Sequence, residues 1–260
     1  MSAMRAIIWR ELLRFLHQRE RFVAALVRPL VWLLIFGAGF RAALGLAIYP
    51  PYDTYIRYET YIVPGLCGII VLFNGMQSAL SIVYDREMGS MKLLLVAPIS
   101  RQWMLFSKLI ASASVGLLQV WTFLLIAYFV GIRVEPMGYI LATPAIFLTA
   151  LMLGALGLAI STLITKLQNF AGVMNFVIFP MFFASTALYP LWRIQENAPW
   201  LARVVEFNPF SHGVELIRFT LYGKLEWVNL VVVVGCLGVF FGLALWGYQS
   251  KRGALKRRFR

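Results

Sequence analysis

Long apolar segments alternate with short polar links along most of this chain. The apolar segments are about 20 residues or longer, enough for an α-helix to cross the roughly 30 Å hydrocarbon core of a bilayer. The pattern predicts six membrane-spanning helices, over residues 24–44, 61–83, 104–130, 138–164, 170–189 and 227–248. We therefore expect an all-α, polytopic membrane protein formed by a single transmembrane domain over residues 1–260.

The first predicted span is interrupted by charge, because Arg28 and Arg41 both fall inside it. Long basic side chains can extend along a helix until the charge reaches the interface. We expect Arg28 to extend toward the cytoplasmic interface and Arg41 toward the outer one. The chain before this span, residues 1–23, reads as an amphipathic helix that lies in the cytoplasmic interface. Its two faces are Ile8, Leu12, Phe15 and Phe22 on the apolar side and Arg10, Arg14 and Arg21 on the basic side. It can be a plain lipid anchor or a docking surface.

The link between the second and third spans, residues 84–98, has the pattern of a short helix with its own apolar stripe. Acidic residues open it, which suits the positive end of a helix dipole, and Pro98 ends it. Methionines and leucines at helical spacing form an adaptable surface. We expect a cytoplasmic helix that contacts either a partner protein or lipid. Its candidate contact residues are Asp85, Arg86, Glu87, Met88, Met91, Lys92, Leu94 and Leu95.

Residues 189–226, between the fifth and sixth spans, are too charged to span and too apolar for a simple loop. Asn208-Pro209 predicts a turn between two short helices, since proline disfavours the α conformation in the residue before it. Ser211 is the expected cap of the second helix. We expect an external re-entrant hairpin, with a solvated loop bearing aromatic anchors as the alternative. Its candidate polar residues are Asn208, Pro209, His212, Glu215 and Arg218.

Small residues four positions apart occur in several predicted spans and allow close helix contact in lipid. The pairs are Gly75 with Ala79, Ala150 with Gly154, Gly157 with Ser161, and Gly238 with Gly242. They indicate a helix bundle.

The composition agrees with a membrane protein: of 260 residues, 61% are hydrophobic and 13% charged. Soluble domains average roughly 45–50% apolar and about 25% charged residues. The net charge of +13 lies wholly in the N-terminal arm with Arg28, residues 84–108, Lys166 and the basic tail 249–260. Basic residues mark the cytoplasmic side, so we expect both termini in the cytoplasm. Basic residues that flank spans also make a nucleic-acid partner unnecessary.

No motif for chemistry stands out. The chain has no G-x-x-x-x-G-K-[ST] phosphate loop and no H-E-x-x-H, and its two histidines lie on opposite predicted sides of the membrane. We therefore expect no catalytic residue, no metal site and no cofactor in this chain. The two cysteines fall in apolar segments and predict no disulfide. No carboxylate lies near the centre of a span, where ion coupling would need one. Neutral polar residues do, and with one aromatic they form the candidate translocation path: Phe73, Asn74, Gln77 and Asn175.

Four stretches together resemble the membrane subunits of type-2 ABC exporters, the ABC-2 permease family. They are YIVPGL (61–66), YDREMGSMKLLLVAPISR (84–101), LYPL (188–191) and NPFSHGVELIRFTLYG (208–223). Nodulation-type lipo-oligosaccharide exporters and drug exporter permeases are among the similar members. The resemblance implies a homodimer, or in some members a heterodimer, of six-span subunits in the bacterial inner membrane. It also implies two copies of a separate cytoplasmic ATPase, which binds ATP and magnesium, and makes residues 84–98 the coupling helix.

The function expected from the resemblance is ATP-driven export of a lipidic or amphipathic cargo. Its path would run along the dimer interface, lined mainly by spans one, two and five. Two alternatives are a membrane assembly or anchoring subunit without transport and an ion-coupled carrier. The missing midspan carboxylates argue against the carrier.

Overall fold

A computed structural model describes residues 9, 13, 19–40, 50–52, 57–88, 100–134, 136–164 and 166–258. These residues form helices joined by turns, and none of them is in a strand, which confirms the all-α prediction. The helices are α2 (Arg19–Phe40), α3 (Tyr58–Glu87), α5 (Arg101–Phe129), α6 (Pro136–Leu163), α7 (Leu167–Phe183), α8 (Leu191–Asn197), α9 (Pro199–Phe207), α10 (Pro209–Leu221) and α11 (Trp227–Arg258).

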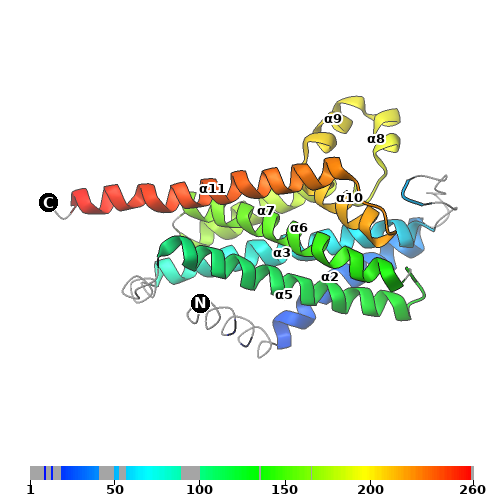
Figure 1. The fold of residues 1–260 in the computed structure, drawn as a ribbon, viewed down its shortest axis with the longest axis horizontal. Helices are drawn as coiled ribbons and strands as arrows, with labels where there is room; N and C mark the ends of the chain where they lie inside the picture. Colours follow the sequence, from blue (N-terminus) through cyan, green and yellow to red (C-terminus); the bar gives the residue numbers. More distant parts are fainter. Residues whose placement is uncertain are drawn as a thin grey trace.

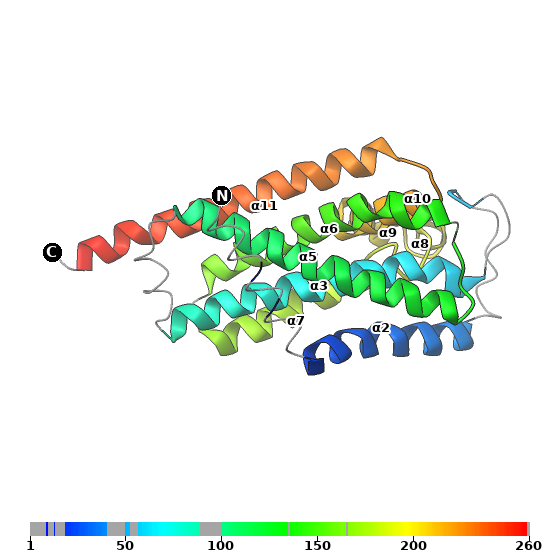
Figure 2. The same ribbon diagram turned by 60° about the horizontal axis from the view of Figure 1, so that its bottom comes forward.

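The long helices run side by side along the longest axis of the molecule (Figure 1). Helix α6 packs against α3, α5, α10 and α11, and α3 packs against α2, α5, α6, α7 and α10. Helices α2 and α11 lie at opposite edges of the bundle (Figure 2). The pair α3 and α6 is therefore the centre of the bundle, and the core follows it.

Glycines set the distance between α3 and α6. A Cβ atom on Gly75 would lie 2.9 Å from the Cα atom of Gly154, and one on Gly157 would lie 3.0 Å from the carbonyl oxygen of Gly75. Only residues without a side chain allow this approach. By contrast, a Cβ atom on Gly238 or Gly242 would meet nothing within 4 Å. Of the small-residue pairs in the sequence, those of α3 and α6 mark a real contact, and that of α11 does not among the described residues.

Four helices are long and apolar enough to cross a bilayer: Tyr58–Glu87, Gln102–Phe129, Pro136–Leu163 and Trp227–Tyr248. Two apolar helices are shorter, Phe22–Ile35 within α2, and α7. A multi-pass membrane protein is thus confirmed, and the number of six spans stays a prediction.

The fifth predicted span ends earlier than expected, because α7 stops at Phe183 and not at residue 189. Proline lies three residues before this end, at Pro180, and the side chain of Asn208 takes up two of the last carbonyl groups. The second span, expected to end at residue 83, continues as α3 to Glu87. Its last turn contains charged residues whose partners lie on neighbouring helices.

The segment after α7 folds as three helices, where two were expected. Helices α8 and α9 project from the end of the bundle opposite the C-terminus of α11 (Figure 1). Helix α10 turns back and packs against α3, α6 and α11. The expected cap of this helix was wrong: Asn208 is its N-cap, and the side chain of Asn208 accepts a hydrogen bond from the backbone N–H of Phe210. Asparagine at the cap position reaches the first free N–H groups of the helix, which Ser211, two residues inside it, cannot do.

Two predicted elements, the amphipathic arm 1–23 and the segment 84–98, lie partly outside the described residues. Of the amphipathic arm 1–23, the side chains of Trp9 and Leu13, both exposed, are described together with those of Phe22 and Val23. Among the candidate contact residues of 84–98, Met91, Lys92, Leu94 and Leu95 lie outside the described residues.

Candidate functional site

Two adjoining cavities lie where α2 meets the rest of the bundle, and together they are called the midspan pocket. One, of about 90 Å³, opens between α2, α3 and α5, and the other, of about 150 Å³, between α2, α3 and α7. Four residues line both: Arg28, Pro29, Ile69 and Phe73. The first cavity adds Ala24, Ala25, Ile70, Asn74, Gln77 and Gln119, and the second adds Trp32, Asn175, Phe179 and Phe182.

All four residues predicted to line a path are in this pocket. Phe73 and Asn74 lie near the middle of α3, Gln77 lies one turn further on, and Asn175 lies at the middle of α7. Although these residues come from two helices far apart in sequence, the fold brings them to two cavities that share part of their lining. The candidate path is therefore a single place in the structure.

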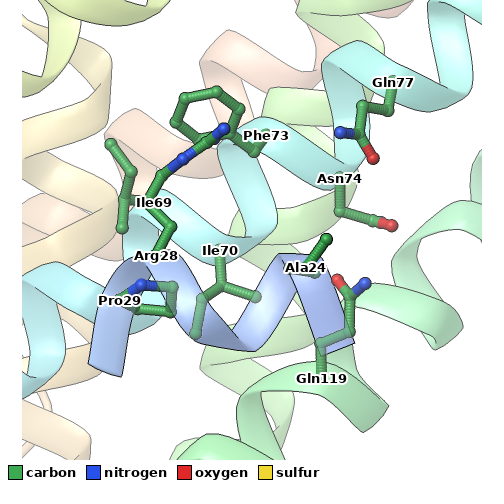
Figure 3. A pocket seen from close by; sticks show the side chains of 10 residues that line it. Ala24, Arg28, Pro29, Ile69, Ile70, Phe73, Asn74, Gln77 and Gln119 are labelled. Atoms are coloured by element: carbon green, nitrogen blue, oxygen red, sulfur yellow. The ribbon is translucent and has the colours of Figure 1, made fainter. Parts of the chain in front are cut away.

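Arg28 is the charged member of this pocket and was not among the predicted path residues. Its guanidinium carbon lies 3.8 Å from the centroid of the Phe73 ring, in a cation–π contact. Figure 3 shows the two side chains pointing toward each other. Arg28 therefore packs on an aromatic ring near the middle of α2 and does not extend to the cytoplasmic interface as expected.

Gln119 of α5 is the second polar residue that the sequence did not place in the path. Its side chain is 2% exposed, and its Oε1 atom has no hydrogen-bond partner among the described residues. Figure 3 shows it pointing into the same space as Asn74 and Gln77 of α3. Asn74 is held by a hydrogen bond of 2.7 Å from its Nδ2 atom to the carbonyl oxygen of Ser112. Gln119 falls inside the third predicted span, but its position in the sequence gives no signal of the direction in which it faces.

The last turn of α3 joins several helices at one end of the bundle. Asp85 accepts a hydrogen bond of 3.1 Å from the Nζ atom of Lys108 on α5. The carboxylate of Glu87 accepts a hydrogen bond of 2.8 Å from the backbone N–H of Leu167, the first residue of α7. A carboxylate at a helix N-terminus stabilises the free N–H groups there.

Arg86, between these two acids, reaches the other helices of this end. Its Nη1 atom donates to the carbonyl oxygens of Ser161 and Ile164 at the end of α6, at 3.0 and 3.3 Å. Its Nη2 atom donates to the Tyr248 hydroxyl of α11 at 3.0 Å. Three consecutive residues of α3 therefore contact α5, α6, α7 and α11. Of the predicted contact residues, Asp85, Arg86 and Glu87 are in this network, and Met88 is the exposed C-cap of α3.

The predicted hairpin residues lie at the other end of the bundle and are largely buried. Arg218 is 0% exposed: it pairs with Glu215, donates to the carbonyl oxygen of Thr186 at 2.9 Å, and stacks 4.1 Å from the centroid of the Tyr61 ring. A fully buried charge must be paired and hydrogen-bonded to be tolerated. Arg218 thus joins α10 to α3 and to the chain after α7.

The irregular stretch 184–190 is buried at this end, and side chains from α3 and α10 bind its backbone. The hydroxyl groups of Tyr58 and Tyr61 donate to the carbonyl oxygens of Leu188 and Thr186, at 3.1 and 2.9 Å. Asn208 donates to the carbonyl oxygens of Met181 and Ala184, at 2.7 and 2.6 Å. Non-helical backbone at membrane depth is tolerated only where protein groups bind it. Pro209 follows as the first residue of α10.

His212 links α10 to the start of α11. The His212 ring nitrogens lie 2.7 Å from Asn229 Oδ1 and 2.8 Å from the carbonyl oxygen of Glu206. These two contacts make His212 part of a packing network. Nearby, partial burial, and then the charge of Glu215, raise the pKa of the Glu226 carboxyl above its usual value. No group of three or more possible metal ligands occurs within the described part of the chain.

Comparison with known proteins gives the family. The model of the family described as ABC-2 type transporter matches residues 2–222. A transport permease, ycf38, of Cyanophora paradoxa is 29% identical over 79% of this chain and 69% of its own length. The daunorubicin resistance ABC transporter permease protein DrrB1 of Streptomyces coeruleorubidus is 21% identical over 96% of this chain and 87% of its own length. Nodulation protein J of Rhizobium leguminosarum bv. viciae is 27% identical over 43% of this chain and 44% of its own length.

This chain belongs to the ABC-2 type transporter family. It is a transmembrane subunit of an ABC transporter, and its family implies a partner ATPase subunit. The alternatives of an assembly subunit and an ion-coupled carrier find no support among the relatives.

Proposed function

We propose that this chain is the permease of an ATP-driven exporter that moves a lipidic or amphipathic cargo out of the cytoplasm or the inner leaflet. The observation that supports it best is the midspan pocket, where Arg28, neutral polar side chains and aromatic rings meet near the middle of α2, α3 and α7. Polar groups inside a membrane bundle cost free energy, so they are a functional site by default. Since the chain lacks a phosphate loop, ATP and magnesium bind to two copies of a separate ABC ATPase.

Two copies of this chain form the transporter. A cavity of about 150 Å³ is small beside the roughly 300–1,000 Å³ of ordinary ligand pockets. Asn175 and Phe179, which line it, are exposed at its rim on α7. A second copy against α2 and α7 would enlarge the pocket and cover these side chains. Membrane lipid surrounds the remaining apolar surface, and no nucleic acid takes part.

Coupling to the ATPase runs through residues 84–98. The described start of this segment is the last turn of α3, where Asp85, Arg86 and Glu87 contact four other helices. A displacement of this turn therefore acts on α5, α6, α7 and α11 together. Because α3 also lines the midspan pocket, the same displacement reaches the path.

The transporter lies in the bacterial inner membrane with both termini in the cytoplasm. The hydrogen bonds of Arg86 place residues 86, 164 and 248 at one end of the bundle. That end contains Lys108 and Lys166 and leads to the basic tail, so it is the end with the excess positive charge.

The test is co-expression with an ABC ATPase from the same genome, followed by purification through a tag on this chain. We expect the ATPase to co-purify and ATP turnover in lipid vesicles to change when an amphipathic cargo is added. The purified permease alone should not hydrolyse ATP. If no ABC ATPase associates, or if the permease alone hydrolyses ATP after contaminants are excluded, the proposal is wrong. Association without cargo-dependent turnover or transport would favour the assembly subunit.

A further inference from the structure

We propose that the midspan pocket selects cargo with an anionic head group and an apolar tail, with Arg28 as the residue that recognises the charge. This inference rests on the proposed export function and specifies its substrate class. It depends on three features of the pocket: its charge, its unused hydrogen-bonding capacity and its apolar wall.

The charge of the pocket is positive. Among the described residues that line the two cavities, Arg28 is the only charged one. No described carboxylate pairs with it, and its guanidinium group lies against the ring of Phe73. The aromatic ring fixes the guanidinium but leaves its N–H donors available, in a planar arrangement that suits phosphate, sulfate or carboxylate. An anionic group is the ligand that completes this site.

One buried hydrogen-bonding group of the pocket also lacks a partner among the described residues. Gln119 is 2% exposed, and its side-chain oxygen has no partner among the described residues. A buried amide oxygen without a hydrogen bond costs free energy, so such a group is rare unless a ligand or water satisfies it. Gln119 and Arg28 line the same cavity. A head group that carries a hydroxyl or N–H donor beside its anion would satisfy both residues at once.

Most of the residues that line the second cavity are apolar, which suits a tail. Ile69, Trp32 and Phe182 form the wall of the second cavity, and the Trp32 and Phe182 rings pack with their centroids 4.9 Å apart. The cavity volumes suit a head group and the first methylenes of a chain. The remainder of the tail would leave the pocket past Phe179 and Phe183, which are exposed on α7. Inorganic phosphate alone would have no contact with this wall.

A cationic head group is disfavoured for the reason that an anionic one is favoured. Charges of equal sign repel, and no carboxylate is among the described residues that line the pocket to offset Arg28. A neutral head group would leave the guanidinium without a charged partner. The expected order of affinity is therefore anionic, then neutral, then cationic.

The experiment measures binding of three probes with the same dodecyl tail to the permease–ATPase complex in phosphatidylcholine nanodiscs. The probes are dodecyl phosphate, dodecyl maltoside and dodecyltrimethylammonium, and binding to empty nanodiscs is subtracted. We expect dodecyl phosphate to bind the most tightly and inorganic phosphate not to bind measurably. Arg28→Gln should weaken dodecyl phosphate binding about ten- to hundredfold and change dodecyl maltoside binding little.

The control variant is Arg133→Gln. Arg133 also lies over an aromatic ring, 5.3 Å from the centroid of Tyr128, but is exposed in the link between α5 and α6. It should leave the binding of all three probes unchanged. Arg28→Lys, which retains the charge, should preserve the order of affinities if Arg28→Gln proves too unstable to measure. Gln119→Leu removes an acceptor and should weaken dodecyl maltoside, whose hydroxyl groups can donate to the Gln119 oxygen, more than dodecyl phosphate, so that dodecyl phosphate remains the tightest probe.

The inference is overturned if dodecyl phosphate binds no better than the other probes, or if Arg28→Gln leaves its affinity unchanged. Binding of inorganic phosphate as tightly as dodecyl phosphate would refute the need for a tail. These outcomes leave the export function intact as long as the ATPase still co-purifies with the permease. Conversely, a charge preference that depends on Arg28, without any ATPase partner, would support the pocket but refute the proposed function.

Discussion

At the scale of single residues, a few polar side chains allow the chain to leave helical geometry inside an apolar bundle. Asn208 is the clearest case, because one amide group binds three backbone groups. It donates to the carbonyl oxygens of Met181 and Ala184 and accepts from the N–H of Phe210. The same side chain therefore binds backbone groups at the end of α7 and at the start of α10.

Replacing this residue should destabilise the fold. We expect Asn208→Ala to lower the free energy of unfolding by roughly 2–4 kcal/mol, since it removes a helix cap and leaves buried carbonyl groups unsatisfied. The measurement is thermal unfolding in detergent, followed by tryptophan fluorescence. Asn197→Ala is the matched control: Asn197 is exposed, and its one hydrogen bond within the described part of the chain is to the carbonyl oxygen of Arg193 one turn earlier. Equal effects of the two substitutions would contradict this role of Asn208.

At the scale of elements, the contact between α3 and α6 determines how closely the central helices approach. Gly75 of α3 and Gly157 of α6 occupy positions where a single methyl group would meet backbone atoms of the other helix. The glycines of α11 at similar spacing face open space. The same sequence pattern therefore has different consequences on the two helices.

Alanine substitutions should have effects of opposite sign on the stability of the protein at the α3–α6 contact and on α11. Gly75→Ala should destabilise the protein by about 1–3 kcal/mol, because the new Cβ atom overlaps the backbone of Gly154. Gly242→Ala should be neutral or stabilising by up to about 1 kcal/mol, since alanine favours the helix more than glycine does. Thermal unfolding of both variants in the same detergent provides the comparison. A stabilising Gly75→Ala would show that the helices can separate at no cost.

The segment 84–98 is the other element with a distinct prediction. Burial of a large apolar side chain contributes roughly 1.5–3 kcal/mol, and 1.4 kcal/mol corresponds to a factor of ten in affinity. If Met91 docks into the ATPase, Met91→Asp should weaken association at least tenfold in a pull-down from membranes. Met137→Asp is the control: Met137 is exposed at the start of α6, at the opposite end of the bundle. Full ATPase binding and transport by Met91→Asp would make the segment a helix that rests on lipid.

Glu87→Ala is expected to act differently from Met91→Asp. The Glu87 carboxylate caps α7, which lines the midspan pocket. Loss of this cap should spare ATPase binding and lower the cargo transported for each ATP hydrolysed. Transport and ATP turnover measured on the same vesicles would reveal the difference. Unchanged coupling would mean that this contact has no part in transmission.

At the scale of the whole molecule, the ends of the bundle differ in charge and in shape. One end contains the network of Arg86 and leads to the basic tail, and the other contains α8, α9 and the buried Arg218. Such asymmetry predicts one orientation in the membrane.

Cysteine labelling of intact cells tests this orientation. Cys67 is fully buried, so only Cys236 needs replacement by alanine. We expect Trp200→Cys to react with a membrane-impermeant maleimide from outside, because Trp200 is exposed on α9. Lys166→Cys, exposed at the other end, should react only after the cells are opened. The reverse pattern would overturn the topology with cytoplasmic termini.

Local patterns in the sequence were sufficient for the class of fold and for the family. Apolar segments about as long as a bilayer is thick predict membrane helices wherever they occur, whatever their neighbours. Local sequence was also sufficient to identify Phe73, Asn74 and Gln77 as path residues, because they are polar or aromatic residues within about one turn of a single helix. Asn175 joined them as a neutral polar residue of another span, and the structure brings all four to one pocket.

Only the tertiary structure decided which distant residues meet. Arg28 and Gln119 face the same cavity because α2 and α5 have particular rotations about their axes. Helix α6 is apolar on every side, so no polar face in its sequence reveals its orientation. The end of α7 depends on Asn208, which lies 25 residues after Phe183 in the chain and reaches it only through the return of α10. Helix formation is a local property that hydrophobic length reveals, whereas rotation and termination depend on long-range packing and hydrogen bonds, which exist only in the folded protein.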